Sequence, residues 1–225
     1  MKENIVILLG HKKRVGKDTV ANYLKSNYNF QIISFAQKLK EIVQDLYDFS
    51  DEQINGDLKD EQDTRYPNNY DLKECLDDYW SKHIDDVDMA IANGVSLKSM
   101  MTPNSEYKEY FTPRRLLQIV GQQQRALYPD IWAKYVFDQI NFSGGRFVIP
   151  DFRFENEYDV AKTWNIFTGG ELITVRIDRD CVFDNTKDVS ENALNSFDRW
   201  DHIISNNTTT QSLYNEVDRL MNEIL

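Results

Sequence analysis

The sequence predicts an α/β protein that contains a mostly parallel sheet of about five strands flanked by helices. Short runs of β-branched and aliphatic residues alternate with longer segments whose apolar residues recur at helical spacing. The first run, residues 5–9, is apolar throughout, which is typical of an inner strand covered on both faces. Strands that alternate with helices form parallel sheets with right-handed crossovers. The expected strands are residues 5–9, 30–35, 147–151, 171–177 and 202–205.

Helices are expected between and after these strands. Val20, Ala21 and Leu24 recur at helical spacing soon after the first strand, so the chain opens in the order strand, loop, helix. Thr112-Pro113 is typical of a helix start, because threonine caps well and proline suits the first turn. Further helices are expected around residues 39–46, 130–140, 155–164 and 211–225.

The composition excludes several classes of function. The 225 residues carry a net charge of −11, and such a field repels DNA, RNA and anionic membranes. We therefore expect no nucleic-acid or membrane partner, and a small anionic substrate needs a local basic cluster. Cys75 and Cys181 lack metal-type spacing, and two cysteines are too few for a disulfide framework in a chain of this length. With neither a signal peptide nor a membrane-spanning run, a cytoplasmic protein is expected.

An acidic segment interrupts the strand pattern. Between Glu41 and Asp88 the chain has 16 acidic residues and four basic ones, and most of these carboxylates are expected on a solvated surface. We predict a single domain over residues 1–225 with an inserted acidic, largely helical subdomain at about 50–105.

Residues 10–19, GHKKRVGKDT, give the strongest functional signal. A strand, a loop ending in Gly-Lys and a helix present backbone N–H groups, a helix N-terminus and a lysine to a polyphosphate. The pattern predicts a P-loop NTPase-type three-layer fold, although His11 stands where the usual spacing has glycine. The predicted ATP-binding residues are Lys13, Arg14, Gly16, Lys17, Asp18 and Thr19.

Asp18 stands where the motif normally has the hydroxyl residue that touches Mg²⁺. It has two interpretations: it holds Mg²⁺ through water, or it is only an acidic residue that favours a helix start. Asp18 is the candidate metal residue, with Asp151 at a strand end as the alternative for ordering the metal.

The chain resembles the deoxynucleoside monophosphate kinases of tailed bacteriophages, especially the T-even type. The likeness lies in Gly16-Lys17-Asp18-Thr19 preceded by Lys13-Arg14, in residues 114–121 and Trp132, in residues 148–153 with Glu157, in Ser190-Glu191, and in residues 201–207. His11 and Val15 differ from the family's usual glycine and serine, and the acidic insertion is poorly matched. The resemblance implies ATP with Mg²⁺ as donor, a dNMP acceptor, a dNDP product, and a role in nucleotide supply for phage DNA replication in the host cytoplasm.

Phosphoryl transfer needs two nucleotides held in line and neutralisation of the charge on the moving group. The predicted catalytic residues are Lys17 for the outer phosphates of ATP, Asp151 at a strand end, and Arg115 and Arg153 as arginine forks for the acceptor phosphate. Either arginine could instead form a surface pair with Glu155 or Glu157. The predicted acceptor site comprises Arg65, Arg115, Gly121, Trp132, Asp151, Arg153 and Glu157, although a tryptophan in this helix is more often a core residue.

Other functions stay open at this point. One is a P-loop kinase of another phosphorylated acceptor, such as phosphomevalonate or dephospho-coenzyme A. Another is a P-loop ATPase or nucleotide-binding protein that transfers nothing. Hydrolases commonly follow the strand-end aspartate with a glutamate, whereas Phe152 and Arg153 follow Asp151 here, which favours transfer. The sequence leaves the oligomeric state open, a homodimer included.

Overall fold

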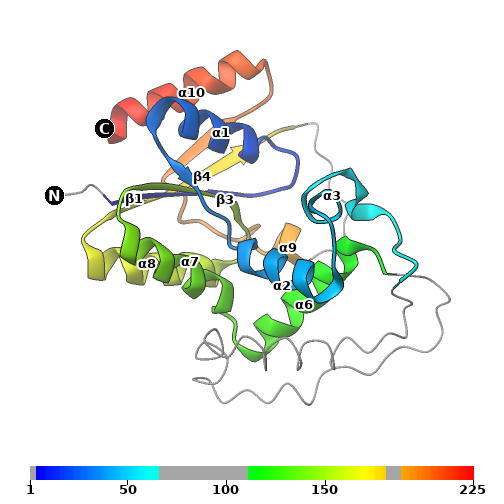
Figure 1. Ribbon diagram of the computed structural model, residues 1–225. Helices are drawn as coiled ribbons and strands as arrows, with labels where there is room; N and C mark the ends of the chain where they lie inside the picture. Colours follow the sequence, from blue (N-terminus) through cyan, green and yellow to red (C-terminus); the bar gives the residue numbers. More distant parts are fainter. Residues whose placement is uncertain (1–3, 66–110, 181–188) are drawn as a thin grey trace. The chain divides into compact units, whose positions relative to one another are not determined.

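The computed structural model describes residues 4–65, 111–180 and 189–225 (Figure 1). The chain divides into two compact units. The first comprises residues 1–35 and 133–225, and the second comprises residues 36–132. Each unit is described by itself. None of the helices in the described residues is both long and apolar enough to span a bilayer.

The first unit contains a parallel sheet, and this confirms the predicted fold class. In the described residues its strands are β1 (Ile5–Gly10), β2 (Gln31–Ile32), β3 (Arg146–Phe152), β4 (Glu171–Asp178) and β5 (His202–Ser205). Their order across the sheet is β2-β3-β1-β4-β5, and every neighbouring pair is parallel. The apolar strand β1 is therefore central, as its unbroken aliphatic run predicts.

One face of the sheet is covered by α1 (Lys17–Tyr28) and α10 (Thr210–Ile224), as Figure 1 shows. Ile5, Ile7 and Leu9 project from β1 into a core shared with both helices. Alternate residues of a strand point to the same face, which is why these three lie together. Val20 of α1 and Val217 of α10 are fully buried in the same cluster. Burial of each such side chain contributes about 1.5–3 kcal/mol to folding.

The other face carries α7 (Ile131–Ser143) and α8 (Glu155–Thr168) (Figure 1). Phe137 of α7 and Trp164 of α8 meet with ring centroids 5.6 Å apart. The short helix α9 (Val189–Asn192) is followed by Phe197 and Trp200, which pack edge-on against Phe152 at the end of β3. Helices on both faces of a parallel sheet complete the three layers of a P-loop NTPase-type fold.

Strand β2 is shorter than the predicted run of residues 30–35. Only Gln31 and Ile32 pair with β3, and the N–H group of Ile33 donates a last hydrogen bond to the carbonyl of Val148. Ser34 and Phe35 then leave the sheet, because both donate to the carboxylate of Asp151 instead.

The second unit is helical in its described part. It contains α2 (Gln37–Tyr47), α3 (Asp51–Asn55), a 3-10 turn η1 (Asp57–Asp60) and α6 (Pro113–Leu127). Thr112 caps α6 by accepting a hydrogen bond from the N–H group of Arg115, and Pro113 occupies the first turn, as predicted. Of the insertion expected at about 50–105, residues 50–65 include α3 and η1, and the rest lies outside the described residues.

Candidate phosphate-binding site

A cavity of about 430 Å³ lies in the first unit, at the carboxyl ends of the strands. Ligands of open parallel sheets bind at this edge. Its lining comprises Lys13, Arg14, Gly16, Lys17, Asp18, Thr19, Pro150, Asp151, Arg153, Arg179, Asn206, Thr208, Thr210 and Leu213. Five of these described side chains are basic and two are acidic, in a chain whose net charge is −11. The cavity is therefore the local basic cluster that a small anion needs.

The loop between β1 and α1 has a positive φ at three positions, His11, Arg14 (φ 59°) and Gly16. Gly16 has φ 108°, and a Cβ atom there would lie 2.5 Å from the side-chain nitrogen of Asn206. His11 has φ 89°, in the left-handed region that the usual glycine of this motif adopts without strain. The residue therefore departs from the motif while the backbone keeps the motif's bend.

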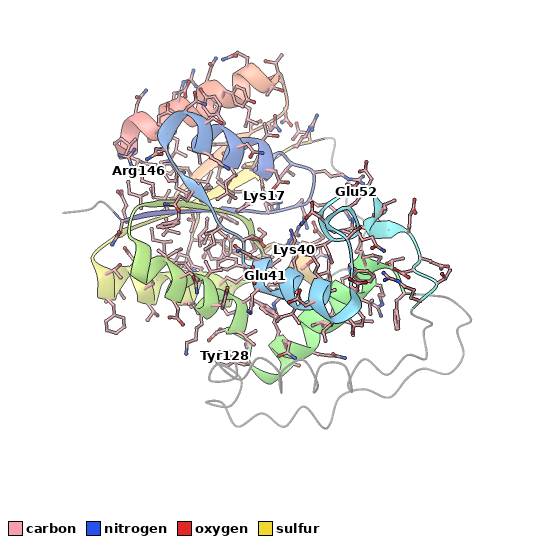
Figure 2. All side chains as sticks on the ribbon, viewed as in Figure 1. Lys17, Lys40, Glu41, Glu52, Tyr128 and Arg146 are labelled. Atoms are coloured by element: carbon pink, nitrogen blue, oxygen red, sulfur yellow. The ribbon has the colours of Figure 1, made fainter. Side chains whose placement is uncertain are left out.

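Lys17 begins α1 (Figure 2) and is only 7% exposed. Its Nζ donates to the carbonyl of His11 at 3.2 Å and to that of Lys12. The pKa of Lys17 is lowered from 10.5 to about 8. Burial is the larger cause, and the positive charge of Arg153 is the second. The carboxylates of Glu191, Asp18 and Asp151 oppose this shift. A polyphosphate in the cavity would supply the negative charge that favours the protonated amine.

His11 contacts a charged pair at the end of β4. Its Nδ1 lies 2.8 Å from Oδ1 of Asp178, and Nε of Arg176 lies 2.8 Å from the same oxygen. Burial, and next the charge of Arg176, lower the pKa of His11 below 6.5 in spite of the raising effect of Asp178. This lowered pKa favours the neutral imidazole of His11 over a cation in the phosphate loop.

Asp151 and Arg153 reach the cavity from the end of β3. The two oxygens of Asp151 accept hydrogen bonds from Ser34 Oγ at 2.6 Å and from the N–H group of Phe35 at 3.0 Å. Asp151 thus fixes the chain where it leaves β2. The guanidinium of Arg153 pairs with Glu191, so the alternative of a pair with Glu155 or Glu157 is not realised in the described residues.

Glu157 supports Arg153 through the backbone. Its carboxylate is part of a side chain only 3% exposed, and it accepts from the N–H groups of Arg153 at 2.8 Å and of Phe154 at 3.0 Å. This contact caps α8 and fixes the turn that follows β3. The geometry gives the predicted acceptor residue Glu157 a positioning role.

A family model for deoxynucleotide monophosphate kinase matches residues 5–217. The chain belongs to this family. A protein of Acanthamoeba polyphaga mimivirus, named "Putative deoxynucleotide monophosphate kinase", is 28% identical over 218 residues, which cover 95% of this chain and 94% of the relative. The matched range contains the phosphate loop and all five strands of the described residues.

Solved kinases show a more distant similarity. The APS kinase CysC of Mycobacterium tuberculosis is 10% identical, with a TM-score of 0.41 and coverage of 99% of both chains. A sugar kinase of Janibacter sp. is 7% identical, with a TM-score of 0.42, and the match covers 98% of this chain and 95% of that one.

Four predicted acceptor residues of this family member belong to the second unit. Arg65 pairs with Asp63 at 2.8 Å, and this hydrogen-bonded pair lowers the pKa of Asp63 to about 2. A Cβ atom on Gly121 would lie 2.9 Å from the side chain of Leu39, so Gly121 lets α6 approach α2. Trp132 is only 2% exposed, as expected for a core residue. Arg115 is exposed and forms no ion pair within the described residues.

Three residues of the site are not among the predicted site residues, although Glu191 and Asn206 lie in segments that carry the family resemblance. Arg179 follows β4 directly, and the rule that ligands bind beyond strand ends could have indicated it. Asn206 donates a hydrogen bond of 2.8 Å to the carbonyl of Val15 in the phosphate loop. Glu191 contacts both the loop and Arg153, and the family resemblance at Ser190-Glu191 is the sequence signal that could have indicated it.

Proposed function

We propose that this family member transfers the γ-phosphoryl group of ATP to a deoxynucleoside monophosphate. A phosphate oxygen of the acceptor forms a bond to the γ-phosphorus, the bond to the β-phosphate oxygen breaks, and ADP and a dNDP leave. The observation that carries the proposal is the presence of two cations from separate segments in the lining of one cavity, Lys17 at the start of α1 and Arg153 directly after β3. Two cations from separate segments are what two phosphate-bearing substrates require.

ATP binds with its phosphates at the loop formed by residues 10–19. The start of α1 offers backbone N–H groups and the positive end of the helix dipole. Lys17 exchanges its contacts with the carbonyls of His11 and Lys12 for phosphate oxygens. Lys13, Arg14, Asp18 and Thr19 line the same cavity and complete the donor side.

The acceptor phosphate binds beside Arg153. A guanidinium binds phosphate through two parallel hydrogen bonds and keeps its charge at every relevant pH. Asp151 holds the adjacent chain and supports the acceptor side, with Glu157 fixing the backbone of Arg153. Asp151 is followed by Phe152 and Arg153 rather than by a glutamate that could activate water, which supports transfer over hydrolysis.

The remaining residues predicted for the acceptor belong to the second unit, and the proposal retains them as candidates. Arg115 has an exposed side chain without an ion pair in the described residues, so it is available to a phosphate. Arg65 carries a guanidinium that is already paired with Asp63, and an acceptor would share it. Gly121 and Trp132 act through packing, because one allows close helix contact and the other is buried.

Mg²⁺ accompanies ATP in this proposal. Asp18 and Asp151 both line the cavity, and Asp18 is exposed. The described residues contain no cluster of three or more metal-ligating side chains. Two carboxylates fit Mg²⁺, because this ion keeps several waters and is commonly bound by one or two carboxylates with substrate phosphates. The ion would neutralise charge on the phosphates, with Asp18 as the residue that holds it and Asp151 as a contact to its waters.

The reaction would supply precursors for viral DNA synthesis. The resemblance to phage enzymes and the mimivirus relative support a viral setting for this part of the proposal.

An ADP-release assay with every dNMP and NMP tests the function. We expect ADP release that depends on a dNMP and on Mg²⁺, together with a dNDP product on chromatography. Phosphomevalonate and dephospho-coenzyme A serve as the competing acceptors. Equal ADP release with and without any acceptor would identify an ATPase and overturn the proposal.

A further inference from the structure

The carboxylate of Glu191 joins two walls of the cavity that come from different strands. One oxygen, Oε2, accepts a hydrogen bond of 2.7 Å from the backbone N–H group of Lys13 in the phosphate loop. The other oxygen, Oε1, accepts from Nη1 of Arg153. Both partners line the cavity, and the Glu191 side chain is only 6% exposed. One buried carboxylate therefore links the proposed donor side to the proposed acceptor side.

Lys12 fixes the segment that carries Glu191. Its Nζ donates to the carbonyl of Glu191 at 2.5 Å, to Oδ1 of Asn192 at 3.1 Å and to Oδ1 of Asn195 at 2.8 Å. The ammonium of Lys12 thus points to α9 and the turn behind it. With the contact from Lys13, two successive loop residues hold Glu191 in place.

The charge of Glu191 matters because cations surround it. Lys17 and Arg153 repel each other, and Glu191 is the carboxylate that most strongly favours the charged form of Lys17. Arg153 is 26% exposed on its side chain, so its free N–H groups remain open to a ligand while Nη1 is held. A guanidinium fixed on one edge loses less rotamer freedom when it binds phosphate.

We propose that Glu191 is a positioning residue for phosphoryl transfer, which holds the Arg153 guanidinium at a fixed position relative to the phosphate loop. The inference rests on the proposed function and adds a residue to it. Glu191 is not among the residues that line the cavity, so the proposal gives it no contact with a substrate. It acts through Arg153 and through the N–H group of Lys13, and so couples the placement of the acceptor to that of ATP.

A merely structural ion pair predicts a different result from a positioning residue. Loss of an ion pair that only stabilises the fold lowers the free energy of unfolding and leaves the kinetic constants of the folded protein unchanged. Loss of a positioning carboxylate lowers kcat. In addition, removal of a negative charge beside a polyphosphate site favours anion binding, so the affinity for ATP should hold or increase. Lower kcat with unweakened ATP binding is thus the distinguishing pattern.

The test compares Glu191→Gln with wild type, and Glu216→Gln serves as the matched control. Glu216 pairs with Arg219 on exposed parts of α10, so the control removes a carboxylate from an ion pair that does not line the cavity. We expect Glu191→Gln to lower kcat roughly 10- to 100-fold, as small misplacements of a reacting group do. In Glu191→Gln, the KM for ATP and the Kd of the ATP analogue AMP-PNP should equal the wild-type values or be lower. Wild-type kcat in folded Glu191→Gln would overturn the inference.

A double-mutant cycle with Arg153→Lys tests whether Glu191 acts through Arg153. If it does, the double variant should be at most about threefold slower than the slower single variant, because both substitutions remove the same alignment. Effects that multiply would show that Glu191 acts elsewhere and would contradict the inference.

A geometric readout separates this inference from the proposed function. Phenylglyoxal modifies free arginine side chains, and mass spectrometry can follow its reaction at Arg153. We expect faster modification of Arg153 in Glu191→Gln than in wild type or Glu216→Gln, and equal rates would contradict the link. A wild-type protein that transfers to no acceptor defeats the proposed function, whereas an active wild type with an unimpaired Glu191→Gln variant defeats the positioning inference alone.

Discussion

The side-chain amide of Asn206 donates a hydrogen bond of 2.8 Å to the carbonyl of Val15, directly before the glycine with φ 108°. The segment after β5 therefore holds the phosphate loop at the position where its backbone is most constrained. Gly16 lies against the same amide, so this position excludes a side chain on two grounds: the left-handed backbone and the missing space.

Gly16→Ala should therefore abolish ATP binding. The Cβ atom would lie 2.5 Å from Nδ2 of Asn206, and the left-handed backbone costs an L-residue about 1–2 kcal/mol. Isothermal titration with AMP-PNP measures the loss. The double variant Gly16→Ala/Asn206→Ala removes the clash and keeps the backbone strain, so it should recover part of the unfolding free energy but not wild-type affinity. A Gly16→Ala protein with wild-type affinity would show that the loop tolerates a side chain.

Lys17→Ala should abolish transfer and leave the fold intact. The lysine acts electrostatically on the phosphates, and each charge-assisted hydrogen bond contributes about 1.5–3 kcal/mol. The assay is ADP release at saturating acceptor, with circular dichroism as the check on folding. Lys25→Ala, an exposed lysine of the same helix, provides the control. Near-normal transfer by folded Lys17→Ala would reject the assignment of the phosphate loop.

Local patterns predicted those parts of the fold that local physics determines. The apolar run of β1 and the Thr112-Pro113 helix start agree with the structure because each depends on neighbouring residues. The sequence places the end of the second strand at residue 35, which is too late. Ser34 instead leaves the sheet because it donates a hydrogen bond to Asp151, 117 residues away. A partner at that distance leaves no periodic trace in the strand itself.

The candidate site divides in the same way. The phosphate loop is a contiguous motif, so its residues could be predicted together. The link through Glu191 joins Lys13, 178 residues away, to Arg153, 38 residues away, and only folding brings the three together. A glutamate in a strongly acidic chain is expected on the solvated surface, yet this one is buried.

Arg153→Lys should impair the acceptor step and spare ATP. Lysine keeps the positive charge but loses the planar fork that binds phosphate through two hydrogen bonds. We expect kcat/KM for the dNMP to fall roughly 10- to 100-fold while the KM for ATP stays unchanged. A rise in the acceptor KM alone would indicate ground-state binding, and a fall in kcat would indicate a contact with the moving group. An enzyme impaired only in ATP binding would contradict the placement of the acceptor.

Lys17→Met should stabilise the folded protein at neutral pH while it removes activity. The folded-state pKa of Lys17 is about 8 because burial disfavours its charge, whereas the unfolded value is 10.5. Below pH 8 both states carry the proton, and the folded state bears the full cost of the buried ammonium. Between pH 8 and 10.5 the unfolded state binds more protons, so wild-type stability rises with pH through this window. A methionine does not titrate, so this position contributes no pH dependence to the stability of Lys17→Met.

The stability advantage of Lys17→Met should therefore be largest below pH 8 and shrink as the pH approaches 10.5. The pKa difference corresponds to an upper value of about 3 kcal/mol, reduced by the two loop carbonyls that lose their donor. Urea unfolding of both proteins at pH 7, 8, 9 and 10, with EDTA and without nucleotide, measures the difference. Lys59, whose pKa burial also lowers to about 8, titrates equally in both proteins and cancels. A stability difference that stays constant from pH 7 to pH 10 would show that the pKa of Lys17 is not lowered in the folded protein. The carboxylates around the loop would then already compensate the charge of its amine.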